Sequence, residues 1–347
     1  MRLVSPLLKH VVYPVLHYSG WLDRITPLAG YAVVNYHGVV PSDYSKGEAF
    51  LDGNLVTPEV FRDQIRFLKT HYRFIHPKEV RASIEQGTPL PARSVLVTCD
   101  DGLLNTLTDM LPVLQSENVP CLFFVTGASC TDDPGMLWYE ELYRLMRLKP
   151  LNEEELQLPI NEDAQSSSSE NSHAFWWNTV RRASRLDAAT RADWMAKLRR
   201  QCGEKPTIPP EKRWRLLSVR ELRQLADAGM TIGAHTITHP ILSLCREEEA
   251  RREIQQSKSD LERALGRPVW AFAYPFGNSA TMGDRELRLA RESGFACAFV
   301  NVEHWTDGAL NPFALPRTHV TSSTTVSELA AHLSGFHNRL QRAVGAG

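Results

Sequence analysis

Two adjacent carboxylates, Asp100 and Asp101, stand where the chain leaves the apolar run Ser94–Cys99. The carboxyl ends of buried strands are where α/β folds place their active sites. Neighbouring side chains on an extended chain point in opposite directions, but a turn at Gly102 allows both carboxylates to face one cavity. The pair is therefore a candidate for metal binding and proton transfer. Asp and Gly are also common in helix caps and turns, so the pair alone leaves a purely structural role open.

Two histidines four residues apart, His235 and His239, follow a second apolar run at 230–234. One helical turn or a tight loop between them lets both imidazoles bind the same metal ion. The H-x-x-x-H spacing is a weak signal by itself, since most such pairs are structural. Combined with an acid from another strand end, it predicts two imidazoles and one carboxylate, a set that suits zinc and leaves positions open for water and substrate.

Two further strand ends carry side chains of interest. His37 follows the run Tyr31–Tyr36, and the segment FAYPFG at 272–277 ends another apolar run. Each has a structural alternative: a histidine satisfied by backbone groups in the first case, and an ordinary strand exit at Pro and Gly in the second.

Apolar, β-branched and aromatic runs predict the strands that must position these residues. The runs are continuous rather than alternating, as in parallel strands buried on both faces. One helix has a capping box, Ser218 with Glu221, and ends at Gly229. Alternating strands and helices predict parallel βαβ units, in a closed barrel or in an open sheet. The predicted strands are 31–36, 94–99, 121–126, 230–234, 269–274, 295–300 and 314–320, and the predicted helices are 58–72, 104–117, 218–228, 246–265 and 284–293.

The composition is that of a globular protein. The 347 residues include 39 basic and 40 acidic side chains, giving a formal net charge of −1. This balance provides no global field for nucleic acid, so no nucleic-acid partner is expected. The six cysteines are scattered without a C-x-x-C pair, which predicts neither a disulfide framework nor a zinc ribbon. Cys99, Cys121 and Cys297 lie in apolar runs, where thiols pack as small hydrophobic groups.

The chain divides into an N-terminal helical extension (1–30), a main domain (31–325) and a C-terminal helix and tail (326–347). An insertion at about 149–214 interrupts the main domain and contains a serine run at 166–169, which is typical of a surface segment. Trp176, Trp177 and Trp194 indicate that its second half is a folded helical cover, a candidate lid over a site.

Residues 1–23 are apolar, but Lys9, His10, Pro14 and His17 interrupt them. The segment resembles neither a cleaved signal peptide nor a transmembrane helix, for which it is too short and too polar. An amphipathic helix that packs on the domain is the preferred interpretation, with peripheral contact to a membrane as the alternative. We expect a cytoplasmic location.

The strand-end motifs together resemble those of the polysaccharide deacetylase family, the NodB-type esterases of carbohydrate esterase family 4. The family motif T-F-D-D-G is similar to TCDDG at 98–102, and H-[ST]-x-x-H matches HTITH at 235–239. The resemblance covers roughly residues 31–320, without the insertion. It implies an α/β fold: a distorted (β/α) barrel of about seven strands, with the motif residues at their C-terminal ends.

The resemblance also assigns roles. It implies that Asp100 is the general base and that Asp101, His235 and His239 bind one divalent metal ion, in this family usually zinc. The backbone N–H of Phe276 is expected to stabilise the oxyanion that forms when water attacks the acetyl carbonyl.

Two departures from the family pattern point to one branch. The third motif is usually R-x-P-Y-G, but Ala273 stands in place of the arginine that orients the base. The late histidine motif has only an imperfect copy, at His319. Both departures are similar to the poly-N-acetylglucosamine deacetylase-like branch, whose circularly permuted barrel takes its acid from an early Y-H-x-V motif. The sequence YHGV at 36–39 matches it, so His37 is favoured over His319 as general acid.

Arg317 is a hypothetical replacement for the missing arginine, and Arg317 and Tyr274 are expected to bind substrate. The implied activity is metal-dependent removal of acetyl groups, in the first instance N-acetyl, from a sugar, oligosaccharide, glycolipid or polysaccharide. A non-catalytic carbohydrate-binding protein on a deacetylase fold and an amidase for small non-sugar amides remain alternatives. The identity of the sugar, the metal used in the cell and the oligomeric state stay open.

Overall fold

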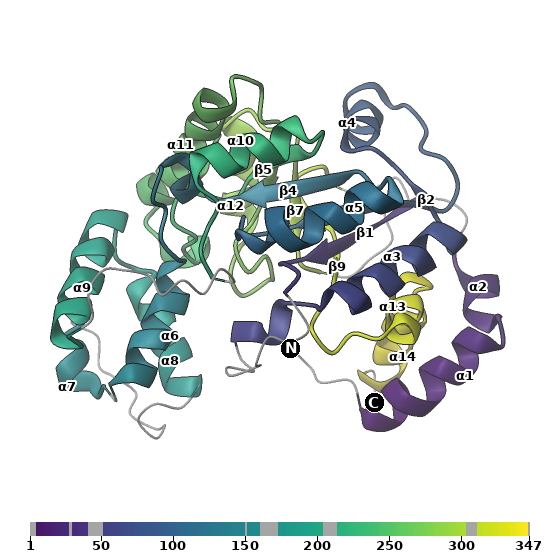
Figure 1. Ribbon diagram of the computed structural model, residues 1–347, viewed down its shortest axis with the longest axis horizontal. Coiled ribbons are helices and arrows are strands. Elements are labelled where there is room, and N and C mark those ends of the chain that lie inside the picture. Colours follow the sequence, from purple (N-terminus) through teal and green to yellow (C-terminus); the bar gives the residue numbers. More distant parts are fainter. Residues whose placement is uncertain are drawn as a thin grey trace.

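The molecule has a parallel sheet at its centre and helices packed around it (Figure 1). The computed structural model describes residues 5–27, 30–40, 51–149, 151–159, 173–203, 214–302 and 311–345. The strands are β1 (Tyr31–Tyr36), β2 (Arg73–Phe74), β3 (Ser94–Cys99), β4 (Cys121–Val125), β5 (Thr231–Ala234), β6 (Ala271–Ala273), β7 (Cys297–Val300), β8 (Leu315–Pro316) and β9 (Thr318–His319). The helices are α1 (Tyr13–Tyr18), α2 (Trp21–Ile25), α3 (Pro58–His71), α4 (Pro77–Gln86), α5 (Leu111–Glu117), α6 (Trp138–Leu148), α7 (Glu153–Leu156), α8 (His173–Ala183), α9 (Ala188–Gln201), α10 (Val219–Asp227), α11 (Glu247–Leu265), α12 (Asp284–Glu292), α13 (Val326–Leu333) and α14 (Phe336–Gly345).

The sheet closes on itself. Its strand order is β8-β7-β6-β5-β4-β3-β1-β9, with β2 added beside β3, and the paired strands are parallel. One short segment, residues 315–319, closes the barrel. Its first part, β8, pairs with β7. Its second part, β9, follows after one residue and pairs with β1. With that segment counted once, seven strands surround the barrel: β1, β3, β4, β5, β6, β7 and β8/β9. The expected distorted barrel of about seven strands is confirmed.

Both faces of each strand are buried, which explains the continuous apolar runs. Val33 and Phe124 belong to the cluster that fills the barrel, while their neighbours Val34 and Phe123 pack outward against the helices. The strand period of two produces this division. Gly233 makes room inside, since a Cβ there would lie 2.6 Å from the Phe124 ring.

Most predicted helices and strands appear within a few residues of their expected limits. The capping box is present, because the Ser218 Oγ accepts from the Glu221 N–H and the Glu221 carboxylate accepts from the Ser218 N–H. The predicted helix 104–117 differs, because it begins as a π-helical turn, Thr106–Met110, before α5. Pro112 has no N–H to donate to the preceding turn, which accounts for this wider start.

Two peripheral helical groups lie at opposite ends of the molecule (Figure 1). At one end α1 and α2 pack beside α13 and α14, where the Tyr13 hydroxyl lies 2.6 Å from His337 Nδ1. At the other end α6, α8 and α9 share their own hydrophobic cluster, which includes Trp176 and Trp194. The serine run at 166–169 lies outside the described residues. The residue limits proposed for the extension, the insertion and the tail stay predictions.

The six cysteines are free thiols, and Cys99, Cys121 and Cys297 are buried in the core, as expected. Among the described residues, no helix has the length and apolar character needed to cross a membrane.

Candidate active site and metal centre

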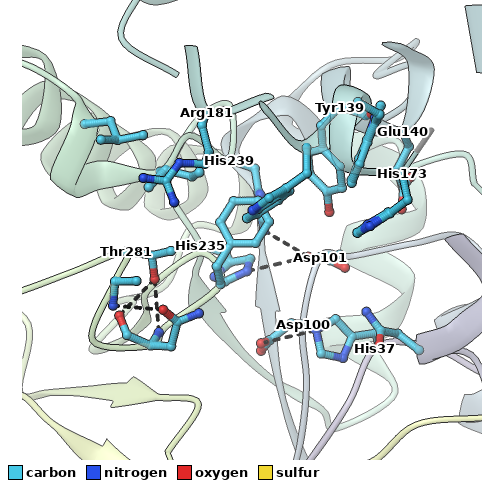
Figure 2. Close-up of a pocket in the computed structure, with 18 of the residues that line it drawn as sticks. His37, Asp100, Asp101, Tyr139, Glu140, His173, Arg181, His235, His239 and Thr281 are labelled. Carbon is cyan, nitrogen blue, oxygen red and sulfur yellow. Dashed lines mark hydrogen bonds and ion pairs between the residues drawn. The ribbon is translucent and has the colours of Figure 1, made fainter. Parts of the chain in front are cut away.

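A cavity of about 470 Å³ opens at the C-terminal ends of the barrel strands (Figure 2). Its floor combines residues that follow β1, β3 and β5, and its far wall comes from α6 and α8. The strand-end residues in the lining include His37, Asp100, Asp101, His235 and His239, and the helical ones include Tyr139, Glu140, His173, Trp176, Trp177 and Arg181.

The turn after β3 directs both carboxylates into this cavity. Asp100 still follows the strand pattern, since its N–H donates to the Tyr36 carbonyl at 2.9 Å. Asp101 and Gly102 then adopt left-handed backbone conformations, with φ of 73° and 77°. A Cβ on Gly102 would lie only 2.7 Å from Val125 Cγ1, so this position requires glycine.

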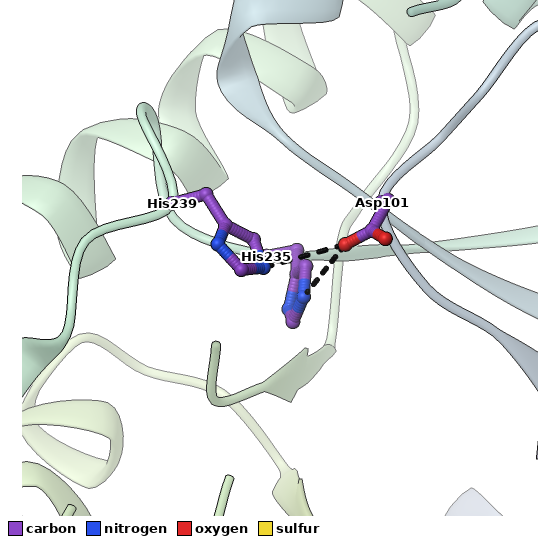
Figure 3. Close-up of side chains that lie close together, drawn as sticks. All are labelled: Asp101, His235 and His239. Carbon is purple, nitrogen blue, oxygen red and sulfur yellow. Dashed lines mark ion pairs between the residues drawn. The ribbon is translucent and has the colours of Figure 1, made fainter. Parts of the chain in front are cut away.

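Asp101 and the two histidines form a compact ligand set (Figure 3). Asp101 Oδ1 lies 3.5 Å from His235 Nε2 and 3.3 Å from His239 Nε2. The ligand atoms of the three buried residues all lie within 4.8 Å of one another. Asp101 Oδ1 makes no hydrogen bond among the described residues, although it is buried. An acceptor oxygen left between two imidazole nitrogens fits a divalent cation, and this donor set suits zinc.

The protonation of these groups also fits a cation. His235 Nδ1 lies 2.7 Å from the Ala273 carbonyl oxygen, which places the proton on Nδ1 and leaves the Nε2 lone pair facing Asp101. Burial raises the pKa of Asp101, but the close approach of the His235 and His239 imidazoles outweighs it and holds that pKa well below its ordinary value. Burial lowers the pKa of His239 against the opposing effect of Asp101. An ionised carboxylate and neutral imidazoles are the forms that bind metal.

The loop that carries the two histidines is strained and tightly held. Thr236 and His239 both have left-handed φ values, 63° and 59°. The Thr236 Oγ1 accepts from the His239 N–H at 3.0 Å. From α11, the buried Glu253 carboxylate accepts from the N–H groups of Ile237 and Thr238 at 2.8 and 2.9 Å.

A second helix supports this loop. Arg191 of α9 is buried, and its Nη2 lies 2.5 Å from the Thr238 Oγ1 and 3.8 Å from Glu253 Oε1. The Thr238 hydroxyl also donates to Glu253 Oε1 at 2.5 Å. The helical cover thus contacts the histidine loop directly.

Asp100 is clamped by Arg317 from the segment that closes the barrel. Arg317 Nη1 and Nη2 donate to the two Asp100 oxygens at 2.6 and 2.8 Å. Asn35 donates to Asp100 Oδ2 at 2.9 Å and accepts from Arg317 Nη1 at 2.9 Å. Burial raises the pKa of Asp100, but the charge of Arg317, aided by His235 and by the Arg317 hydrogen bonds, lowers it overall. A bidentate arginine fixes the plane and the charge of a carboxylate together.

His37 and His319 lie close together but in different surroundings. His37 lines the cavity, and its Nε2 lies 4.0 Å from Asp100 Oδ2. His319 does not line the cavity, and its Nε2 lies 3.2 Å from Asn54 Oδ1. Burial, with a smaller contribution from His37, lowers the pKa of His319 to about 3. Access to the cavity favours His37 as the acid, which stays a prediction.

The segment after β6 places one aromatic side chain in the cavity and another in the core. Phe276 lines the cavity with a left-handed φ of 60°, and among the described residues its N–H makes no hydrogen bond to protein. Tyr274 instead points outward into the helical layer, where its hydroxyl donates to the Phe313 carbonyl at 3.0 Å. Alternation along β6 explains this, because Ala273 is the residue that faces the barrel interior.

The structure therefore does not bring Tyr274 to the site as a substrate-binding side chain. Arg317 does not line the cavity either, since it is fully buried behind Asp100. Neither position supports the expected contact with substrate.

Comparison with known proteins gives the family. Residues 87–298, more than half of the chain, match the model of the family described as polysaccharide deacetylase. The chain belongs to the polysaccharide deacetylase family. Over 110 residues this family member is 28% identical to the poly-beta-1,6-N-acetyl-D-glucosamine N-deacetylase of Escherichia coli (strain K12). That match covers 31% of the chain and only 16% of the length of the relative.

Solved structures share the fold of this polysaccharide deacetylase family member at low identity. The Streptococcus pyogenes deacetylase PplD, in complex with acetate, matches with a TM-score of 0.56 and 16% identity, covering 89% of this chain and 99% of that one. IcaB from Ammonifex degensii matches with a TM-score of 0.53 and 19% identity, covering 88% and 97%.

Several residues in and around the cavity of this family member were not assigned a role from the sequence. Asn35 had one signal, a polar residue within the apolar run YAVVNY, which predicts a buried polar group with a partner. Tyr139, which the sequence offered only as an aromatic residue that could stack on a sugar ring, is a neighbour of the metal centre, with its ring 5.1 Å from that of His239 and 5.6 Å from that of Phe276. His173 and Arg181 gave no signal, because nothing in the spacing of α8 connects it to the barrel.

Proposed function

We propose that the protein is a metal-dependent hydrolase that removes acetyl groups, N-acetyl in the first instance, from a carbohydrate. One observation carries the proposal: the buried set Asp101, His235 and His239 lies beside a clamped Asp100 at the floor of a cavity. Membership of the polysaccharide deacetylase family supports the carbohydrate class. The name of the Escherichia coli relative supports N-acetylglucosamine units as the first substrates to test.

Different residues of this chain carry out different parts of the proposed reaction. A divalent ion held by the three ligands, zinc in the first instance, would polarise the acetyl carbonyl and make water a stronger acid. Asp100, held ionised by Arg317, accepts the proton of the attacking water. The Phe276 N–H is available to donate to the carbonyl oxygen as negative charge develops on it. His37, which lines the cavity, donates a proton to the departing amine.

The cavity fits a sugar rather than an extended apolar ligand. Its volume of about 470 Å³ lies within the range of small-molecule sites. Tyr139, Trp177 and Phe276 provide aromatic surface, while His173 and Arg181 provide polar groups at the same wall. Aromatic faces with polar groups beside them suit the mixed surface of a pyranose ring.

The arginine missing at Ala273 is an argument for the alternative of a non-catalytic binding protein. Arg317 weakens that argument, because it supplies a guanidinium to Asp100 from another strand. Hydrolysis of a small non-sugar amide remains a competing activity, and comparing acetate release from acetylated sugars and simple acetamides distinguishes the two. The cytoplasmic location stays a prediction.

The first experiment is metal content together with acetate release. We expect about one equivalent of zinc or a similar ion in the wild type and a loss of most of it in His235→Ala. Asp100→Asn is the matched control, because it should keep the metal and lose nearly all turnover. A folded wild type that binds no divalent ion would rule out the proposed mechanism. Metal retention without acetate release from any acetylated sugar would favour the non-catalytic alternative.

A further inference from the structure

The N-terminal helices expose an unusual amount of apolar surface. Among the described residues, seven large hydrophobic side chains are exposed, and five of them lie between residues 7 and 21. Leu7, Val15 and Tyr18 retain 65%, 62% and 82% of their surface. Single exposed hydrophobic residues need no explanation, but a contiguous group marks an interaction site. We call the five residues the apolar stripe: Leu7, Val11, Val15, Tyr18 and Trp21.

The apolar stripe occupies one face of an anchored helical segment. Leu7, Val11, Val15 and Tyr18 follow one another at intervals of four, four and three residues along the helical run 6–18, which is π-helical at Leu8–Val12, and this is the spacing of one helix face. Trp21 begins α2, just beyond a turn at Gly20 that has a left-handed φ of 72°. The opposite face is packed, because Tyr13 and Leu22 are buried and Lys9 pairs with Glu328 of α13 at 3.0 Å. Packing on the domain thus uses only one face of this amphipathic segment.

The surroundings of the apolar stripe are basic. Residues 5–25 contain a single acid, Asp23, and it lies 3.0 Å from His71 Nδ1. Helix α14 contains no acid and carries two exposed arginines, Arg339 and Arg342. Its Phe336 ring lies 5.5 Å from that of Trp21, so α14 borders the stripe. Arg24 is a further exposed cation at the end of α2.

We propose that the apolar stripe docks on the surface of an anionic lipid bilayer. Aliphatic side chains would enter the boundary of the acyl chains, while Tyr18 and Trp21 would lie at the level of the headgroups. The bordering arginines would meet the negative surface, each strengthening binding roughly fivefold. A second copy of the chain is a poorer occupant, because a symmetric contact would bring the same arginines together. The basic border therefore selects a lipid surface over self-association.

Docking in this way leaves the cavity accessible. The helices α1 and α2 lie at the end of the molecule opposite α6, α8 and α9 (Figure 1). Because α6 and α8 supply one wall of the cavity, the proposed lipid contact does not cover its entrance.

The test measures co-sedimentation of the full chain with two kinds of vesicle, pure phosphatidylcholine and phosphatidylcholine mixed with phosphatidylglycerol. The wild type should bind the anionic vesicles, and added salt should weaken the binding. A variant with Val11→Ser, Val15→Ser and Tyr18→Ser should bind at least about tenfold more weakly. Leu148→Ser is the matched control, because Leu148 is 58% exposed on α6, outside the stripe, and its loss should change nothing.

A second variant and a second measurement separate the remaining outcomes. Arg339→Gln with Arg342→Gln should weaken binding to anionic vesicles and reduce its salt dependence. Equal binding by wild type and stripe variant, or no binding by the wild type, would overturn the proposal. A stripe variant that converts an oligomer to a monomer in light scattering, without any effect on vesicles, would identify a second copy as the occupant instead. All these positions are exposed, so unchanged melting temperatures would confirm that the variants fold.

Discussion

Asp100 is the residue whose surroundings decide the proposed chemistry. A buried carboxylate without a partner would take up a proton and could not act as a base at neutral pH. Arg317 prevents this with two hydrogen bonds, and Asn35 holds both partners. Arg317 is itself positioned over the Phe124 ring, with its Cζ 5.4 Å from the ring centre. The guanidinium therefore sets both the direction and the ionisation of the carboxylate.

Replacing Arg317 should change the pH dependence of the reaction. Arg317→Gln leaves Asp100 buried, which raises its pKa, but removes the positive charge that lowers this pKa most. The pKa of Asp100 should therefore rise. The acidic limb of kcat/KM should then move to higher pH by about one unit or more. Arg317→Lys keeps the charge and should shift the limb less.

The position of the limb is the useful measurement, because it does not depend on how much of the protein folds. Removing one partner of a buried ion pair costs about 3–5 kcal/mol, so a lower yield of folded Arg317→Gln is expected. An unchanged limb in an active Arg317→Gln would exclude a role for Arg317 in holding Asp100 ionised.

At the scale of elements, the histidine loop depends on two helices. Left-handed backbone at Thr236 and His239 costs roughly 1–3 kcal/mol per residue. Glu253 of α11 offsets this cost by accepting from two loop N–H groups, and Arg191 of α9 neutralises its buried charge. The position of His239 is thus set by residues that do not touch the cavity.

Glu253→Gln should therefore weaken metal binding. The glutamine amide has one acceptor oxygen where the carboxylate has two, so its NH2 group would face either the two loop N–H groups or the Thr238 hydroxyl, all of which now donate to Glu253, and the loop would relax. We expect about a 10- to 100-fold loss of zinc affinity, measured by competition with a chelator. Glu248→Gln is the matched control, because it removes the same charge from an exposed position on the same helix. Equal zinc affinity in both variants would show that the loop holds its geometry without Glu253.

At the scale of the whole molecule, the barrel closes through a segment that contains a buried histidine. His319 lies on β9, which pairs with Asn35 and Val34 of β1, and its ring lies 4.8 Å from that of His37. Its pKa of about 3 in the fold, against 6.5 when unfolded, means that the unfolded chain binds an extra proton between these values.

Acid should therefore begin to destabilise the closed barrel at a pH above the range in which the carboxylates titrate. The contribution of His319 to stability is fully present above pH 6.5 and is lost progressively as the pH falls from 6.5 towards 3. His319→Gln should show a flatter decline of melting temperature over this window. Other histidines with a lowered pKa, such as His239, contribute to the same slope, so the difference between wild type and variant is the measurement. Parallel declines would show that His319 does not titrate on unfolding.

Local signals in the sequence determined the strands and the residues at their ends. The apolar runs before Asp100, His235 and His37 predicted β3, β5 and β1, because a strand buried on both faces must be apolar along its length. Parallel strands end at the same rim, so these residues were expected to converge, and they line one cavity. The barrel of about seven strands followed from the resemblance carried by the same motifs.

Only the tertiary structure decided which distant residues complete the site. Arg317 reaches Asp100 across 217 positions of sequence, and Arg191 supports a loop that begins more than forty positions later. No periodicity or spacing in the sequence predicts either contact, because each depends on where the barrel closes and where the helical cover lies. Tyr274 is a further example. Its place in a motif predicted a side chain in the cavity, but the alternation of side chains along β6 directs it into the core. Sequence patterns report the local environment of each residue, whereas contacts between distant segments are set by the packing of the whole chain.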